Sequence, residues 1–474
     1  MADRREFLKT SCAALTMTAM ATQMRHFGLI NALAQEKDFD GSGDGGNYKA
    51  LVCVFLSGGN DSNNTVIPNY DAGYGQYSAA RSPQGLAIPR ANLLSITPPA
   101  MNGDAYGFHP SMAEMHTLWN QNKLAVVTNV GTLMQPLTRA QYQSGAARPM
   151  QLFSHSNQVE QFKTAISNYS SSTGWGGRLA DRTANLNGGA AIPMISQLST
   201  GANVYTVGNS STPLIVAPSP TPLNQVLALN GFPVTPTAEE TARRTAMDNI
   251  RAADLNYSMT QAASVITQQA INVSQQLSTD PVLTVTFPNT VLGNQLKQVA
   301  KLMKFRTQLN MSRQVFYVQL GGFDTHSGQL ANQASLWTQV SQALKAFYDE
   351  TVAQGISDNV TSFTMSDFNR TLNPAGSGSG VGSDHAWGGH HFVMGGAVLG
   401  GNFYGRPTSN GSIFPTLVTA GPDDAETRGR IIPSVSVEQY AATLARWFGL
   451  SNTDIPLVFP NINAFSSSNL GFMV

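Results

Sequence analysis

The sequence predicts an α/β protein with a doubly wound, mainly parallel sheet that carries helices on both faces. Four short runs are almost continuously apolar, which is typical of strands buried on both faces: residues 50–57, 124–130, 315–320 and 360–365. Apolar residues recur at helical spacing in three further segments, 112–119, 292–305 and 336–348. Buried strands that alternate with amphipathic helices are the order from which a parallel sheet is built.

The N-terminal residues have the order of a twin-arginine export signal. Asp3-Arg4-Arg5-Glu6-Phe7-Leu8-Lys9 is followed by a weakly apolar run from Cys12 to about Met24, and then by the small-x-small sequence Ala32-Leu33-Ala34. A chance arginine pair on an amphipathic helix is the alternative, and the order of the three features favours the signal. We therefore expect a signal peptide over residues 1–34, the twin-arginine translocase as export partner, and a folded periplasmic or secreted mature chain that begins at Gln35.

Composition excludes several classes of function. The apolar N-terminal run is short and rich in Thr, Ser and Met, and no later segment has the roughly 18 uninterrupted apolar residues of a stable membrane span. Lys and Arg number 28, as do Asp and Glu; loss of residues 1–34 removes four basic and two acidic residues, so the mature net charge is near −2. That balance argues against nucleic acid or an anionic membrane surface as a partner. Cys53 would be the one remaining cysteine, without a disulfide partner.

Residues 35–49 are expected to form a flexible linker. Their glycines formally match a dinucleotide-binding pattern, but they precede a strand instead of following one. Their acidic residues formally match the start of a calcium loop, but Lys49 stands where that loop needs a bidentate acid.

The remaining chain, 50–474, is expected to form a single α/β domain with an insertion at about 185–280. Residues 185–235 are rich in Pro, Ser, Thr, Gly and Asn, which predicts an irregular segment. Residues 237–279 are polar and contain neither Pro nor Gly, which predicts one long helix of modest apolar content.

Acidic and histidine residues gather in the loops that follow the predicted strands. In an open α/β sheet, ligands bind beyond the carboxyl ends of the strands. The loops after the runs at 50–57, 315–320 and 360–365 contain Asp61, then Asp324 and His326, then Asp367 followed by Asp384, His385, His390 and His391. Asp oxygens and His nitrogens are ligands of divalent ions, and strand-end loops can bring distant residues together. The gathering favours a metal or catalytic centre.

Taken singly, most of these residues have a structural alternative. Asp61 follows two glycines and could be a turn or helix-capping residue. Asp324-Thr325-His326 could form a hydrogen-bonded turn, and His390 or His391 could serve packing alone. Asp384-His385 has the fewest such alternatives.

Ser154 is a candidate nucleophile with an equally simple alternative. It precedes a segment of helical patterning, 157–166, so it would lie near a helix N-terminus, where backbone N–H groups can stabilise an anion. The alternative is that Ser154 or Ser156 is only the N-cap of that helix.

Short motifs recur along nearly the whole mature chain: Leu56-Ser57-Gly58-Gly59-Asn60-Asp61, His109-Pro110, Ser154-His155, Gly174-Trp175-Gly176-Gly177-Arg178, Gly322-Phe323-Asp324-Thr325-His326, Ser366-Asp367-Phe368, Gly382-Ser383-Asp384-His385 and the closing stretch from Gly429 to Gly449. With these motifs the chain resembles a bacterial family of exported proteins, DUF1501, which is related to the alkaline phosphatase and sulfatase superfamily.

The resemblance implies an alkaline-phosphatase-like fold and a metal-dependent hydrolase of a phosphate or related ester. The divalent ion or ions would be zinc, magnesium or calcium, and would clamp the ester oxygens and lower the pKa of the attacking hydroxyl group. On that plan Ser154 is the nucleophile. The implied pool of metal ligands is Asp61, Asp324, His326, Asp367, Asp384 and His385.

The chain departs from the superfamily at some of these motifs. It has Asp324-x-His326 where Asp-x-x-x-His is common, and Ser366-Asp367-Phe368 where Ser-Asp-His is common. Because Phe368 cannot bind a metal, either another residue supplies that ligand or the site holds one ion. The Cys-x-Pro-x-Arg motif that sulfatases convert to formylglycine is absent, so a mechanism of that kind is not expected.

A non-catalytic protein is the alternative function. It would keep the phosphatase and sulfatase fold while it binds or assembles an envelope component, and the polar, Asn- and Gly-rich loops suit that role as well as they suit an enzyme. An oxidoreductase is disfavoured because the chain has no haem-attachment or iron–sulfur cysteine set and no well-placed dinucleotide loop.

Overall fold

The computed structural model describes residues 48–474 with the exception of 200, 202, 227–234, 254–257 and 377. The predicted signal peptide at 1–34 and all but the end of the predicted linker at 35–49 lie outside these residues. Among the described residues, no helix combines the length and the apolar character needed to cross a bilayer.

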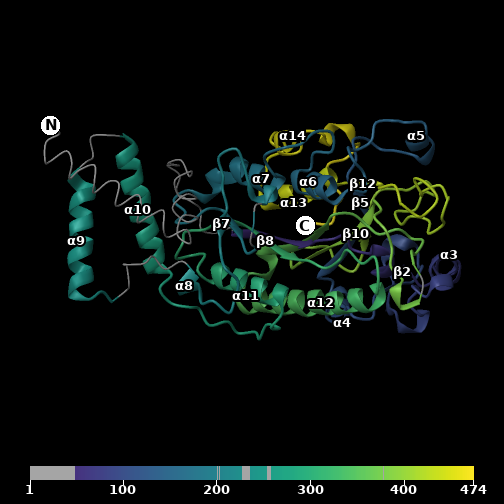
Figure 1. Ribbon diagram of the computed structural model, residues 1–474, viewed down its shortest axis with the longest axis horizontal. Helices are drawn as coiled ribbons and strands as arrows, with labels where there is room; N and C mark the ends of the chain where they lie inside the picture. Colours follow the sequence, from purple (N-terminus) through teal and green to yellow (C-terminus); the bar gives the residue numbers. More distant parts are fainter. Residues whose placement is uncertain (1–47, 200, 202, 227–234, 254–257, 377) are drawn as a thin grey trace.

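A large, mostly parallel sheet crosses the middle of the molecule, as the sequence predicts (Figure 1). In the described part of the chain its strands are β1 (Lys49–Leu56), β5 (Leu124–Gly131), β6 (Ile195–Gln197), β7 (Leu214–Ile215), β8 (Arg313–Leu320), β9 (Val360–Ser366), β10 (Gly389–Gly395), β11 (Phe403–Tyr404) and β12 (Val435–Ser436). They run in the order β11-β5-β10-β9-β1-β8-β6-β7, and β12 pairs with β5. β1 is central and pairs in parallel with both β8 and β9.

β10 is the antiparallel member of the main sheet, lying between β9 and β5. The expectation that residues 389–391 belong to a loop is wrong, because Gly389, His390 and His391 begin this strand. Two histidines do not have the apolar pattern of a buried strand, yet both are buried: His390 stacks on Phe414 and His391 on Tyr440. Aromatic packing replaces the missing aliphatic pattern.

Helices cover both faces of the sheet, which confirms the predicted fold class (Figure 1). The lower face in that view carries α4 (Ala113–Asn120), α11 (Val291–Lys304) and α12 (Gln329–Ala353). The upper face carries α6 (His155–Thr164), α7 (Trp175–Thr183), α13 (Val437–Phe448) and α14 (Ile455–Val458). The predicted helices at 112–119, 292–305 and 336–348 correspond to α4, α11 and the middle of α12.

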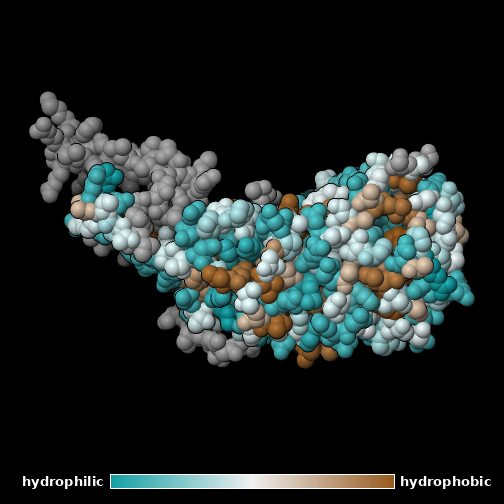
Figure 2. Space-filling view, turned by 90° about the horizontal axis from the view of Figure 1, so that it is seen from below, coloured by the Kyte–Doolittle hydropathy of each residue, from teal (hydrophilic) through white to brown (hydrophobic). Residues whose placement is uncertain are grey.

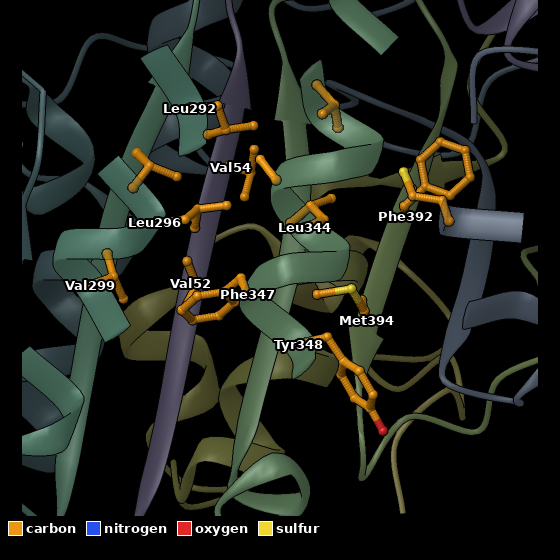
Figure 3. Packing of buried hydrophobic residues seen from close by; sticks show 14 of the residues in the cluster. Val52, Val54, Leu292, Leu296, Val299, Leu344, Phe347, Tyr348, Phe392 and Met394 are labelled. Atoms are coloured by element: carbon orange, nitrogen blue, oxygen red, sulfur yellow. The ribbon is translucent and has the colours of Figure 1, made fainter. Parts of the chain in front are cut away.

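The core consists of two apolar layers, one on each face of the sheet, because successive side chains of a strand point to opposite faces. Val52 and Val54 of β1 belong to the layer between the sheet and helices α11 and α12, which also contains Leu296 and Phe347 (Figure 3). Leu51, Cys53 and Phe55 of the same strand belong to the layer under α7 and α13. Complete burial of β1 from Ala50 to Leu56 explains its continuous apolar run.

A small second sheet and several short helices complete the body. The strands of the small sheet are β2 (Val66–Pro68), β3 (Leu94–Ile96) and β4 (Tyr106–Phe108), in the order β2-β4-β3. The accompanying helices are α3 (Asp71–Arg81), α5 (Arg139–Gln143) and α8 (Leu223–Val226).

The predicted insertion at about 185–280 contributes both to the sheet and to a projection. β6 and β7 extend the main sheet beyond β8. α9 (Ala238–Ala253) and α10 (Ser258–Gln276) project from one end of the body (Figure 1). The face of the body that carries α11 and α12 is largely hydrophilic, with separate apolar patches (Figure 2). The predicted single helix over 237–279 is therefore wrong. Asp254, Asn256 and Ser258, between and at the edge of the two helices, are residue types that disfavour helix interiors.

Candidate metal centre

The candidate centre lies where β1, β8 and β9 end side by side. The loop after β1 and the loop after β8 touch at Gly58, whose φ is 118° and where any side chain would collide with the backbone of Asp324. The Gly58 N–H donates to Asp367 Oδ1 at 2.9 Å, which ties in the loop after β9. Glycine is needed at 58 because only it allows both the positive φ and this close approach.

His155 enters the centre from the first turn of α6. Its Nδ1 lies 2.7 Å from Asp367 Oδ2 and donates to that carboxylate, which can only accept. This hydrogen bond raises the pKa of His155, and burial opposes the rise. The other ring nitrogen, Nε2, is buried, makes no hydrogen bond to any described residue, and lies 3.4 Å from Asp324 Oδ2.

His385 comes from the long loop between β9 and β10. Its Nδ1 donates to the carbonyl oxygen of Phe153 at 2.8 Å. Burial lowers the pKa of His385 and the Phe153 carbonyl opposes the drop, so the net effect favours the neutral ring. A neutral ring with its proton on Nδ1 has a lone pair on Nε2, and that atom lies 3.4 Å from Asp324 Oδ1.

His326 follows the same pattern. Its Nδ1 lies 3.2 Å from Asp384 Oδ1, an atom that can only accept a hydrogen bond from it. Its Nε2 lies 3.0 Å from both Asp324 Oδ1 and His385 Nε2. Three imidazoles thus present Nε2 toward the Asp324 carboxylate, each with Nδ1 bonded to an acceptor behind it.

Asp324 is the shared partner of the three rings. Burial raises the pKa of Asp324, but the hydrogen bond and charge of Arg370 outweigh burial and hold it below its usual value. The carboxylate is therefore ionised at neutral pH. Arg370 donates to Oδ1 at 2.6 Å and is itself fully buried.

The donor atoms of His155, Asp324 and His385 all lie within 4.8 Å of one another. Ligands at about 2.0–2.1 Å from a tetrahedral zinc ion are about 3.3 Å apart, and the separations of 3.0–3.4 Å fit that spacing. When the rings are neutral, their lone pairs face one another and a carboxylate, an arrangement that is repulsive without a cation. The residues therefore fit a divalent metal ion.

The structure brings four of the six predicted ligands together and separates two. Asp324, His326, Asp384 and His385 form one cluster, in which Asp384 lies behind His326 and also pairs with Arg428 at 2.6 Å. Asp367 stands one hydrogen bond behind His155. The sixth, Asp61, lies apart: it is fully buried and pairs with Arg81 at 2.7 and 3.0 Å, and Gln329 also donates to it.

Ser154, the predicted nucleophile, is the N-cap residue of α6, directly before His155. Its hydroxyl makes no capping hydrogen bond to the helix backbone. Oγ instead lies 3.1 Å from Ser156 Oγ and 3.1 Å from Asn157 Oδ1. The hydroxyl is thus held by side chains of the first turn of α6, next in sequence to a residue of the candidate centre.

Sequence reasoning missed His155, Arg370 and Arg428 as parts of the centre. His155 did carry a signal in the sequence, because Ser154-His155 stands at the start of a predicted helix. The rule that ligands bind at strand ends, however, directs attention to the loops that follow strands. The arginines carried no signal, because only their pairing with Asp324 and Asp384 gives them a place in the centre.

One protein-family model, described as "Protein of unknown function (DUF1501)", matches residues 48–454 of the chain. No curated protein matches the sequence.

Several solved structures are similar to the chain at low identity. One is a sulfatase from Pseudoalteromonas sp., with 9% identity, TM-score 0.32, and coverage of 90% of this chain and 70% of that one. Another, from Vibrio parahaemolyticus, is described as a protein in the alkaline phosphatase superfamily, with 9% identity, TM-score 0.34, and coverage of 90% and 75%. A third is the soluble domain of lipooligosaccharide phosphoethanolamine transferase A from Neisseria meningitidis, with 9% identity, TM-score 0.30, and coverage of 81% and 96%.

Proposed function

The chain belongs to the DUF1501 family, and from that premise we propose that it is a metal-dependent hydrolase of a phosphate or related ester. The observation that carries the proposal is the convergence of three histidine Nε2 atoms on the Asp324 carboxylate. Each imidazole is oriented by an acceptor on its Nδ1, the arrangement that fixes histidines as metal ligands.

The donor set selects among the candidate ions. Three imidazole nitrogens and one carboxylate oxygen suit zinc, whereas magnesium and calcium prefer sites made of oxygen atoms. We therefore expect zinc to bind at His155, Asp324, His326 and His385. Bound there, it would stabilise negative charge on an ester oxygen and lower the pKa of an attacking hydroxyl group.

The chain's own residues supply the remaining chemistry. Arg370 holds the Asp324 carboxylate in place from the protein interior. Ser154 is proposed as the nucleophile, because its hydroxyl is not used as a helix cap and lies at the N-terminus of α6, where backbone N–H groups can stabilise an anion. A Ser154→Ala variant tests this role: ester hydrolysis should fall at least a hundredfold while the metal content stays unchanged.

Export by the twin-arginine route remains part of the proposal. It is supported by the arginine pair, apolar run and small-x-small sequence within residues 1–34. N-terminal sequencing of protein recovered from the periplasm or medium should give a chain beginning at Gln35. Recovery of the protein only from the cytoplasm, with residues 1–34 intact, would refute this part.

The decisive experiment combines metal analysis with hydrolysis assays on the purified mature chain. Elemental analysis should find zinc, and phosphomonoesters, phosphodiesters and sulfate esters should be assayed as substrates. Asp324→Asn should lose most of the metal and at least a hundredfold in hydrolysis. Asp71→Asn is the matched control, because Asp71 is an exposed aspartate that also pairs with an arginine. A metal-free chain that hydrolyses none of these esters would refute the proposal and leave the non-catalytic binding protein as the better explanation.

A further inference from the structure

We propose that the centre binds a single divalent ion per chain, because the further carboxylates that a second ion would need already have partners, an arginine among them. This inference rests on the proposed metal centre and adds the number of ions and the residues that set it. It concerns Arg370 and Arg428, whose contacts give both a role in metal binding without making either a ligand.

Arg370 is built into the centre as a permanent cation. One terminal nitrogen donates to Asp324 Oδ1 at 2.6 Å and lies 3.3 Å from the carbonyl oxygen of Gly58. The other donates to the carbonyl oxygen of Ser383. The guanidinium is completely buried and joins the loops after β1, β8 and β9, so it cannot move away to make room for a second ion.

Arg428 pairs with Asp384 from the partly exposed side of the centre, 2.6 Å from Oδ2. The other oxygen of Asp384 faces His326 Nδ1. Asp384 thus orients a metal-binding histidine with one oxygen and pairs with an arginine through the other, so a second ion would have to compete with Arg428 for this carboxylate.

The two other predicted carboxylate ligands are also engaged. Asp61 has both oxygens on Arg81, and Gln329 donates to one of them. Asp367 accepts from the Gly58 N–H with one oxygen and from His155 with the other. After His155, Asp324, His326 and His385 are assigned to one ion, each carboxylate oxygen of Asp61, Asp367 and Asp384 already has a partner among the described residues, so a second ion would have to displace or share one.

The count is tested by titrating the metal-stripped mature chain with Zn²⁺ in a calorimeter and by elemental analysis after desalting. One tightly bound ion per chain is the expected result. Two ions of comparable affinity would overturn the inference and leave the proposed hydrolase standing. No bound ion would remove the metal centre itself, and the proposed function with it.

The role of the arginines is tested with Arg428, because its side chain is 39% exposed and its replacement should not prevent folding. Arg428→Gln removes a positive charge near the ion, so Zn²⁺ should bind about fivefold more tightly, as expected for a partly exposed charge several ångströms away at a dielectric constant near that of water. Arg428→Lys keeps the charge and should bind Zn²⁺ like the parent.

Arg90→Gln is the matched control, because Arg90 forms a similar pair with Asp71 at 2.7 Å and is 41% exposed. It should leave Zn²⁺ affinity unchanged. Equal affinity in Arg428→Gln and the parent, measured without any substrate, would show that Arg428 does not oppose metal binding and would overturn this part of the inference.

Discussion

Histidines have two opposite uses in this protein, and their surroundings separate them. At the candidate centre, His155 and His385 each have a polar partner on one ring nitrogen and direct the other toward Asp324. In β10, His390 and His391 are buried against aromatic rings, and their Nδ1 atoms lie 3.1 Å from Asn129 N and 3.4 Å from Thr364 Oγ1. Burial lowers the pKa of each to about 3, aided at His390 by the charge of His391. These two rings are neutral structural residues.

Their burial predicts a loss of stability in mild acid. In the unfolded chain a histidine has a pKa of about 6.5, whereas the folded values are about 3, so the unfolded state gains protons first as the pH falls. The stabilising contribution is complete above pH 6.5 and is lost progressively toward pH 3. At pH 5 the free energy of unfolding should be lower by about 2 kcal/mol for each of the two histidines than it is above pH 6.5, since one pH unit corresponds to about 1.4 kcal/mol.

Urea unfolding at pH 8 and pH 5 measures this loss. His391→Phe retains an aromatic ring against Tyr440 but cannot be protonated, so the difference between the two pH values should shrink by about 2 kcal/mol. An unchanged difference in this variant would show that His391 does not contribute to the acid sensitivity.

At the residue scale, sequence predicts which side chains gather but not how they pair. Asp324, His326, Asp384 and His385 were identifiable because strand ends are where α/β proteins place ligands. Asp61 satisfied the same rule, yet its carboxylate pairs with Arg81 at the end of α3. A pairing between residues in separate elements depends on tertiary packing, which no local pattern encodes.

At the scale of elements, two helix starts with serine N-caps are used differently. Ser436 begins α13 with a complete capping box, in which its hydroxyl accepts from the Gln439 N–H and the Gln439 side chain accepts from the Ser436 N–H. Ser154 begins α6 without a capping hydrogen bond. One serine stabilises its helix, and the hydroxyl of the other bonds to side chains and not to the helix backbone.

This difference predicts that replacing serine by alanine changes the free energy of unfolding much more at Ser436 than at Ser154. Ser436→Ala should lower the free energy of unfolding by about 1–2 kcal/mol, because the cap is fully buried and its backbone donor would lose its partner. Ser154→Ala should change stability by less than about 0.5 kcal/mol. Urea unfolding of both variants measures the contrast, and a loss of stability at Ser154 equal to that at Ser436 would assign Ser154 to helix capping.

Element types were predictable where the pattern was strong. The apolar runs became β1, β5, β8 and β9, because burial on both faces requires apolar residues at every position. β10 was missed because its first residues are glycine and histidine. The polar stretch at 237–279 has the composition of a helix almost throughout, so its division into α9 and α10 depends on a few residues near 255.

At the scale of the whole molecule, the centre joins parts of the chain that are far apart in sequence. His155 lies on α6, Asp324 and His326 follow β8, and His385 precedes β10. The central position of β1 between β8 and β9 places their ends side by side. Global unfolding must separate these ligands, so an ion bound by all of them should stabilise the whole fold.

Metal binding should therefore raise the thermal stability of the mature chain. An ion that binds only the folded state at about 100 times its Kd adds about 2.7 kcal/mol, which in a domain of this size corresponds to a few degrees in Tm. Calorimetric scans with Zn²⁺ and with a chelator should differ by that amount in the parent protein. In Asp324→Asn the difference should disappear, because the carboxylate shared by three imidazoles is lost. If Zn²⁺ raised the Tm of Asp324→Asn as much as that of the parent, the stabilising ion would have to bind elsewhere, and the convergence at Asp324 would need an explanation other than metal binding.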